Sequence, residues 1–254
     1  MHDEPVVILP GFFNSPSNYE GMASSLASSL NREVYIAPIE RADWWPSLRG
    51  SSFRWYLDSA YDCINDSLSR TRANCCSIVA HSAAGWLARI LLGNAIYDGN
   101  VYNLQSRVRS LVTLGSPHTS REAYPIKCPE KRQGEESHEL STAARRSSLQ
   151  FANEVYADTT ASFPRVSITS VVGNLLRGSF TSPLGLWARQ CYIVSADRGQ
   201  VDGDGVTPVS TAFLSGAHSN LVLPGVGHDR PFARLGAGWY GSQAVVESWL
   251  SAIA

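Results

Sequence analysis

Six short apolar runs, separated by longer stretches with helical patterns, constrain the fold of this 254-residue chain more than any other feature. Each run is four to eight residues long and mostly apolar or β-branched, as expected of strands that are covered on both faces. The runs comprise residues 5–9, 34–39, 75–80, 108–114, 165–172 and 220–223. This alternation predicts an α/β fold with a minimal, mostly parallel six-stranded sheet flanked by helices.

Helical patterns occupy much of the sequence between these runs. They span residues 17–30, 48–68, 84–92 and 242–253. The second pattern repeats large apolar side chains at three- and four-residue steps, which predicts one buried stripe, and Ser242 is a candidate N-cap of the last. No internal repeat is present, and the length suits one α/β domain. We therefore expect residues 1–254 to form a single domain.

Two excursions interrupt the alternation, at residues 119–150 and 173–203. Within the first, residues 121–146 hold eleven charged side chains, and the second is richer in glycine and aromatic residues. One interpretation is a pair of solvated surface loops. The other is a lid or cap over a binding crevice, because loops that leave the carboxyl ends of strands surround that crevice.

One segment places a serine between a strand and a helix. The sequence VAHSAAGW at residues 79–86 ends the third apolar run and leads directly into a helical pattern. A nucleophile elbow requires this context, and also small residues two positions before and two after the serine. Ala80 and Ala84 are small, although glycine is usual at both places. The segment predicts Ser82 as a nucleophile; the alternative is an ordinary turn with an incidental serine.

A serine hydroxyl needs a base to take its proton, and the base needs a carboxylate to hold its tautomer. In folds with such an elbow the order along the chain is Ser, then Asp or Glu, then His. His228 lies just after the last predicted strand and is therefore the expected base. His218 precedes that strand, and His118 suits a structural or oxyanion-loop role. We expect His81, the neighbour of Ser82, to be structural.

Three aspartates are candidates for the carboxylate. Asp204 lies in the loop that enters a helix expected near Thr207 and Pro208, with Thr207 as its cap and Pro208 at its first position. This placement favours Asp204, with Asp202 and Asp197 as the alternatives.

An oxyanion formed on Ser82 would need two backbone N–H donors. Ala83 follows the serine, and Phe12 lies in the loop after the first strand, so we expect these two N–H groups, with Phe13 as an alternative to Phe12. Aromatic residues could also line an apolar acyl pocket or simply belong to the core. These are Phe12, Phe13, Trp44, Trp45, Phe180 and Trp187.

Composition argues against several classes of partner. The chain has 21 Lys and Arg against 22 Asp and Glu, so no strong field draws it to nucleic acid or an anionic membrane. Five cysteines, with Cys75 and Cys76 adjacent, indicate reduced thiols and a reducing compartment. No zinc-ligand spacing occurs, and we expect no metal and no cofactor. No apolar run approaches membrane-spanning length, so we expect a soluble protein without a transmembrane segment.

Taken together, these motifs resemble the lipase and esterase branch of the α/β-hydrolase superfamily. The matching pieces are LPGF at 9–12, AHSAAGWLAR at 80–89, LGSPH at 114–118, GDGVTP at 203–208 and PGVGH at 224–228. A closer resemblance is to lipase-like hydrolases of plants, algae and cyanobacteria, through VVGN at 171–174 and WYGSxAVVExW at 239–249. The likeness covers almost the whole chain except the charged excursion.

The resemblance implies an α/β-hydrolase fold with a lid-like insertion and a Ser82, Asp204 and His228 triad. It also favours a helix over residues 186–195, and it adds the plastid to the cytoplasm as an expected location. The implied activity is hydrolysis of a small-molecule or lipid ester through an acyl-enzyme, with transient contact to a lipid surface. The alternatives are a thioesterase, amidase or acyltransferase with the same triad, or a non-catalytic binding module.

Overall fold

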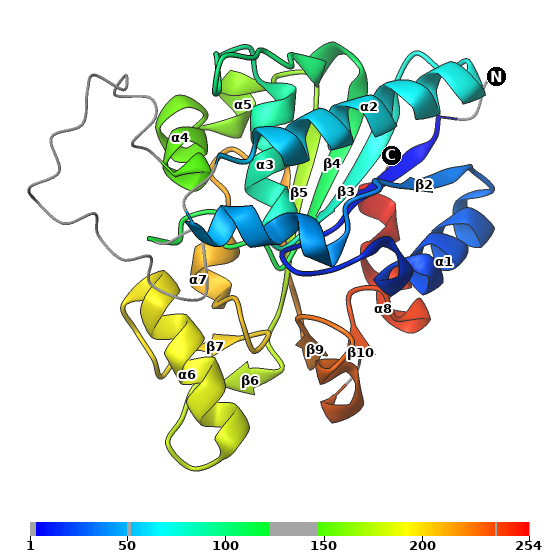
Figure 1. Cartoon of the computed structure of the whole chain (residues 1–254). Helices are drawn as coiled ribbons and strands as arrows, with labels where there is room; N and C mark the ends of the chain where they lie inside the picture. Colours follow the sequence, from blue (N-terminus) through cyan, green and yellow to red (C-terminus); the bar gives the residue numbers. More distant parts are fainter. Residues whose placement is uncertain (1–3, 50–51, 122–146, 237, 254) are drawn as a thin grey trace, which may run out of the picture.

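A single six-stranded parallel sheet organises the chain, as the alternation of apolar runs predicts (Figure 1). The computed structural model describes residues 4–49, 52–121, 147–236 and 238–253. The sheet order is β2-β1-β3-β4-β5-β8, and every neighbouring pair is parallel. The strands are β1 (Val6–Leu9), β2 (Val34–Ile36), β3 (Cys76–His81), β4 (Val108–Leu114), β5 (Ser167–Gly173) and β8 (Ser219–Leu223).

Helices connect these strands and cover both faces of the sheet. They are α1 (Glu20–Leu30), α2 (Arg54–Thr71), α3 (Ala84–Leu92), α4 (Ser148–Val155), α5 (Thr159–Ser162), α6 (Pro183–Ala196), α7 (Val209–Ala212) and α8 (Gln243–Trp249). Among the described residues, two short strand pairs lie outside the main sheet: β6 (Leu176–Arg177) pairs with β7 (Asp202–Gly203), and β9 (Val226–Gly227) pairs with β10 (Gly238–Trp239).

The alternation of side chains along each strand builds two separate hydrophobic clusters. Along β1, Val7 and Leu9 join a cluster with α2 and α3, whereas Val6 and Ile8 join a second cluster with α1 and α8. All four are fully buried, as expected of a strand covered on both faces. The buried sheet therefore gives the loops at its carboxyl edge a rigid support.

The strand order reverses beside β1, which has β2 on one side and β3 on the other. In open α/β sheets the crevice at such a switch point is where ligands bind. The loop that begins at Pro10 follows β1, and Ser82 follows β3, so both lie at this place. The topology thus brings together two segments that are some seventy residues apart in the sequence.

Several predicted boundaries shift by a few residues. The second strand ends at Ile36 rather than residue 39, and Pro38, which has no N–H group to pair, lies just beyond it. The predicted helix 48–68 begins only at Arg54. Helix α7 begins at Val209 with Pro208 at the N-cap, so the expected cap at Thr207 is wrong. Ser242 does occupy an N-cap position, but its hydroxyl accepts a hydrogen bond from the Trp239 N–H instead of capping the helix.

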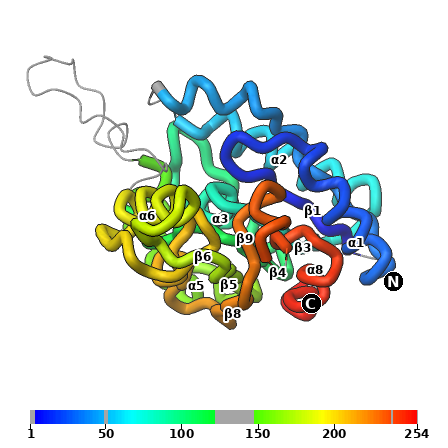
Figure 2. The backbone as a smooth tube through the Cα atoms, turned by 90° about the horizontal axis from the view of Figure 1, so that it is seen from below, coloured from blue at the N-terminus to red at the C-terminus, as the bar shows by residue number. Residues whose placement is uncertain are grey.

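The two excursions differ in what the structure describes. Residues 122–146 of the charged excursion lie outside the described residues. The second excursion contains β6, α6 and β7, and α6 confirms the helix expected over residues 186–195. Ser182 caps α6 by accepting a hydrogen bond from the Gly185 N–H. Figures 1 and 2 show α6 on the side of the molecule opposite α1.

Arg89 fastens the helix that follows Ser82 to its neighbour. Its side chain is buried in α3 and donates to the Asn153 Oδ1 atom at 2.9 Å and to the backbone carbonyl oxygens of Ala152 and Tyr156 at 2.7 and 2.5 Å. Burial lowers the pKa of this guanidinium to about 10. The contacts hold α4 against α3 and so support the turn before α3.

We expect Arg89→Ala to lower the free energy of unfolding by about 3 kcal/mol, because buried carbonyl oxygens lose charged donors. Urea denaturation measures this. Arg54→Ala is the control, since Arg54 is exposed on α2 and pairs with Asp58; its effect should stay within about 0.5 kcal/mol. Equal effects of the two substitutions would show that Arg89 does not anchor α3.

Candidate active site

Ser82 occupies a strained turn between β3 and α3. Its φ angle is 54°, in the left-handed region that non-glycine residues rarely adopt. The turn is held by hydrogen bonds from the Ser82 N–H to the Leu114 oxygen at 2.8 Å and from the Gly85 N–H to the Ser82 oxygen at 3.0 Å. Such strain persists only where the surrounding structure enforces it, and it is typical of functional sites. This strained turn between a strand and a helix has the geometry that a nucleophile elbow requires.

Close packing explains the small residues around this turn. A Cβ atom on Gly11 would lie 2.8 Å from the His81 Nδ1 atom and 2.9 Å from the Ser82 Cβ atom. A Cβ atom on Gly85 would lie 2.1 Å from the Ser116 Oγ atom. Ala80 and Ala84 are both fully buried. The loop after β1 and the start of the loop after β4 therefore press directly against the elbow.

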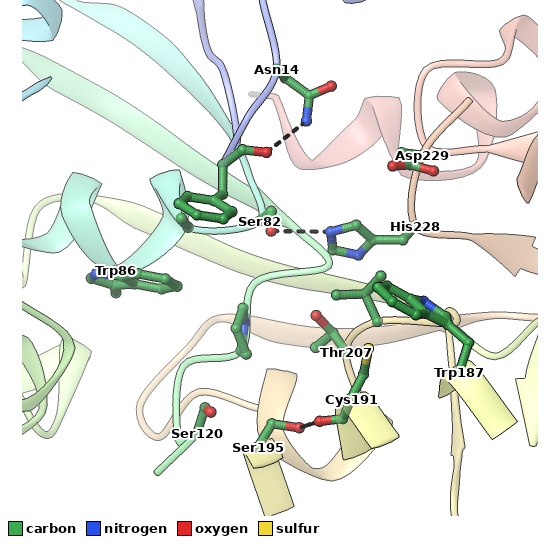
Figure 3. A pocket seen from close by; sticks show the side chains of 14 residues that line it. Asn14, Ser82, Trp86, Ser120, Trp187, Cys191, Ser195, Thr207, His228 and Asp229 are labelled. Atoms are coloured by element: carbon green, nitrogen blue, oxygen red, sulfur yellow. Dashed lines mark hydrogen bonds between the residues drawn. The ribbon is translucent and has the colours of Figure 1, made fainter. Parts of the chain in front are cut away.

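A chain of hydrogen bonds joins Ser82, His228 and Asp204 (Figure 3). The His228 Nε2 atom lies 3.0 Å from the Ser82 Oγ atom, and its Nδ1 atom lies 2.7 Å from the Asp204 Oδ2 atom. With a neutral imidazole, Nδ1–H donates to the carboxylate and Nε2 accepts from the serine hydroxyl. The three residues expected from the sequence thus meet in space, in the arrangement that activates a serine hydroxyl.

Asp204 is fully buried and accepts four hydrogen bonds. Besides the His228 ring, the Tyr240 hydroxyl donates to Oδ2 at 2.6 Å, and the N–H groups of Val206 and Thr207 donate to Oδ1 at 2.9 and 2.6 Å. A buried carboxylate needs such partners to offset the loss of hydration. Tyr240 in turn accepts from the Gly173 N–H at 2.8 Å. Tyr240 carries no signal in the sequence beyond its place in the WYGS motif.

The two alternative aspartates point elsewhere. Asp202 forms an ion pair with Arg177 across the β6–β7 ribbon at 3.2 Å, and both side chains are more than half exposed. Asp197 forms an ion pair with Arg121 on the surface. Within the described residues, the carboxylate that contacts His228 is that of Asp204.

The environment of His228 sets its basicity. Burial by itself lowers its pKa, but the adjacent Asp204 carboxylate raises it through charge and a hydrogen bond, and Asp229 raises it further. The balance leaves the pKa of His228 above its ordinary value of 6.5. An imidazole with a raised pKa is a stronger base toward a serine hydroxyl.

Two other histidines, His81 and His118, have structural partners. The Nδ1 atom of His81 lies 2.7 Å from the Tyr19 hydroxyl, and its Nε2 atom lies 2.9 Å from the His228 carbonyl oxygen. Burial, aided by the neighbouring His228, lowers the pKa of His81 to about 3. His118 contacts the Thr113 hydroxyl at 2.9 Å, and burial also lowers its pKa. Both rings are therefore neutral supports near physiological pH.

A pocket of about 220 Å³ opens above Ser82 (Figure 3). Its wall includes Ser82 and His228 and both residues expected to supply oxyanion donors, Phe12 and Ala83. Ala83 immediately precedes α3, where the first N–H groups of a helix have no partner within the helix. The Tyr19 hydroxyl accepts from the Gly11 N–H at 2.9 Å and so fixes the start of the loop that carries Phe12.

The aromatic residues divide between pocket and core. Phe12 and Trp187 line the pocket, and so does Trp86, which sequence analysis did not single out. Trp44 is fully buried in the hydrophobic cluster of α2 and α3. The remaining three candidates are not part of this pocket wall: Phe13, Trp45 and Phe180. Helix α6 supplies one side of the wall through Trp187, Cys191 and Ser195.

Three further properties concern the described residues only. The cysteines among them, at positions 63, 75, 76 and 191, are all free thiols. No described group of three or more His, Cys, Asp or Glu side chains is arranged to hold a metal ion. None of the described helices has the length and apolar character needed to cross a membrane.

No family model matches the sequence, and no curated protein matches it significantly. Solved structures do resemble the fold. Lipase BlEst2 of Bacillus licheniformis, in its mature form, is 16% identical with a TM-score of 0.64, over 100% of this chain and 93% of its own. A structure of the metagenome-derived lipolytic enzymes LipS and LipT is 13% identical with a TM-score of 0.55, over 98% and 92%.

A third structure, the product of the gene lin2722 of Listeria innocua, is 15% identical with a TM-score of 0.51, over 97% of this chain and 93% of its own. Likeness at this level of identity establishes architecture. The chain has the α/β-hydrolase fold, as the motifs imply. The resemblance to plant, algal and cyanobacterial hydrolases stays a prediction.

The histidine environments predict distinct titrations by NMR. We expect His228 to titrate above pH 6.5 and His81 to stay neutral down to about pH 3. Below pH 6.5 the unfolded chain binds protons that native His81 and His118 do not, so these two groups lower stability as the pH falls. His228 acts in the opposite sense: it adds stability below pH 6.5 that is lost as the pH rises through its folded pKa.

Side-chain NMR spectra recorded between pH 4 and 9 test this, with His81→Gln and His228→Gln used to assign the signals. A His81 signal that titrates near pH 6.5 would contradict the buried, neutral ring.

Proposed function

We propose that the chain is a serine hydrolase that cleaves carboxylic esters through a covalent acyl-enzyme on Ser82. One observation carries the proposal: Ser82, His228 and Asp204 form a hydrogen-bonded chain. The Ser82 backbone has a positive φ angle, and its hydroxyl lies 3.0 Å from the His228 Nε2 atom. The other ring nitrogen of His228 lies 2.7 Å from the buried Asp204 carboxylate. A hydroxyl so placed is a nucleophile with its base and orienting acid already assembled.

In the first half of the reaction, Ser82 Oγ attacks the carbonyl carbon of the ester while His228 Nε2 takes the hydroxyl proton. The new bond between oxygen and carbon leaves a negative charge on the former carbonyl oxygen, which we assign to the N–H groups of Phe12 and Ala83. The bond from carbon to the alcohol oxygen then breaks, and His228 returns the proton to the departing alcohol. The acyl group remains on Ser82.

In the second half, water replaces the alcohol. His228 takes a proton from the water as its oxygen attacks the acyl carbon, and the bond from carbon to Ser82 Oγ breaks. The proton returns to Ser82, and the carboxylic acid leaves. Throughout, Asp204 stays ionised and holds the imidazole in the tautomer that presents Nε2 to the serine.

The pocket supports an ester of modest size with an apolar acyl group. The pocket volume of about 220 Å³ lies somewhat below the roughly 300–1,000 Å³ typical of small-molecule sites. Trp86 and Trp187 contribute large apolar surfaces to the wall, and Trp187 is about half exposed at 53%. Phe180 and Leu184 nearby in the sequence are also exposed. This apolar surface suits an acyl chain and transient contact with a lipid surface.

The same three residues could serve a thioesterase, amidase or acyltransferase. The solved structures of similar fold include a lipase and lipolytic enzymes, which favours esters among these substrates. A non-catalytic binding module would need neither the strained serine nor the buried carboxylate that orients its partner. We therefore place ester hydrolysis first.

Labelling with a fluorophosphonate probe tests the nucleophile. We expect the wild-type chain to be labelled once, and Ser82→Ala to abolish labelling because the attacking oxygen is gone. Intact mass spectrometry measures the adduct. Ser120→Ala is the matched control, since Ser120 lines the same pocket, and it should stay labelled. Persistent labelling of Ser82→Ala would sink the assignment, and an unlabelled wild type would favour a binding module.

Three aspartate variants test the acid. Asp204→Asn should lower kcat on a p-nitrophenyl ester by roughly 10⁴-fold, because the imidazole loses the group that holds its tautomer. It should also lower the pKa of His228, since the raising charge is removed. Asp202→Asn and Asp197→Asn are the controls and should keep wild-type kcat. Near wild-type activity of Asp204→Asn would refute its role.

A further inference from the structure

Asp229 follows His228 directly and lines the same pocket, yet the proposed reaction does not use it. Its Oδ1 atom is shielded from solvent and has no hydrogen-bond partner among the described residues. Burial raises the pKa of Asp229, partly offset by His228. A buried carboxylate oxygen without a donor is costly, so each instance asks for an explanation.

The chemistry of the site tells which part of an ester lies beside Asp229. His228 Nε2 must deliver a proton to the departing alcohol oxygen, so the alcohol part lies against the His228 side of Ser82. The proposed oxyanion donors, Phe12 and Ala83, belong to other segments of the pocket wall. Asp229, joined to His228 in the chain, is therefore placed to contact the alcohol part rather than the acyl chain.

The two sides of His228 differ in polarity. In the view of Figure 3, Asp229 lies on one side of the His228 ring, as does Asn14, and Trp187 lies on the other. Of the described residues that line the pocket, none is a lysine or arginine. Apart from the neighbouring His228 and a hydrogen bond from the Phe232 backbone, the Asp229 carboxylate therefore meets no basic side chain in the described part of this wall.

We propose that Asp229 is a specificity-determining residue that accepts a hydrogen bond from a hydroxyl group on the alcohol part of the ester. The preferred substrates are then partial esters of a diol or polyol. This inference rests on the proposed ester hydrolysis. A hydroxyl group can donate to the Asp229 carboxylate where this residue lines the pocket, whereas a quaternary ammonium has no N–H group to donate.

Two esters of nearly equal shape test the proposal. Propyl butanoate and 2-hydroxyethyl butanoate share the acyl group and differ by a terminal methyl or hydroxyl group. We expect wild-type kcat/KM to favour the hydroxyethyl ester by about tenfold, as for a donor that satisfies a buried charged acceptor. A second pair, butanoylcholine and 3,3-dimethylbutyl butanoate, compares a cation with its neutral isostere.

Asp229→Ala removes the acceptor, and the ratio of kcat/KM for the first pair should fall to about one. Because the ratio is taken within each variant, a general loss of activity cancels. Asp229→Asn keeps an acceptor oxygen without the charge, so it should retain part of the preference. Asp202→Ala is the matched control, since its carboxylate lies outside the pocket wall and pairs with Arg177; it should keep the wild-type ratio.

The outcomes separate the two levels of the proposal. Equal ratios in the wild type and Asp229→Ala, with both esters hydrolysed, would overturn the role of Asp229 and leave ester hydrolysis standing. Discrimination confined to the choline pair would overturn it in favour of cation recognition. A change in pH profile with an unchanged ratio would mean that Asp229 acts only on His228. A wild type that hydrolyses neither pair and is not labelled at Ser82 would remove both proposals.

Discussion

The hydrogen bonding of the buried Asp204 carboxylate is the interaction on which the rest of the site depends. Enclosed completely, it is tolerable only because four donors meet it, from His228, Tyr240, Val206 and Thr207. These donors come from the turn after β7, the end of β9 and the end of β10. The Asp204 carboxylate therefore stabilises the turn at Val206 and Thr207 and orients the His228 ring. It also links the β9–β10 ribbon to the main sheet through Tyr240, which accepts a hydrogen bond from the Gly173 N–H at the end of β5.

The opposite end of the hydrogen-bonded chain depends on packing rather than charge. Ser82 holds a left-handed backbone at a place where β3, the loop at Gly11 and the start of α3 pack closely together. Arg89 stabilises the same turn indirectly, because its guanidinium group in α3 donates hydrogen bonds to α4 and to Tyr156 just after it. A rigid, doubly covered sheet thus supports the strained turn at Ser82, and in the proposed reaction the group that moves there is a proton on His228.

The wall of the pocket beside these residues is formed by loops and helices that lie outside the six-stranded sheet. Helix α6, from the second excursion, supplies Trp187, Cys191 and Ser195 to one side. Asn14 and Asp229 contribute polar groups elsewhere on the wall. In the proposed reaction this division separates an apolar acyl group from a hydroxyl-bearing alcohol, with the reacting carbonyl between them at Ser82.

The sequence by itself determined the class of fold and singled out Ser82 and His228 as candidates, because these signals are local: apolar runs mark the strands, and Ser82 and His228 each follow one directly. It could only rank Asp204 above Asp202 and Asp197, since the three lie within eight residues of one another in the same kind of loop. The tertiary structure decided between them, because only folding brings one of these carboxylates to the His228 ring and leaves the others paired with surface arginines. Tyr240, Trp86 and the unpartnered oxygen of Asp229 likewise have no local signature: their roles arise from contacts between segments distant in the chain.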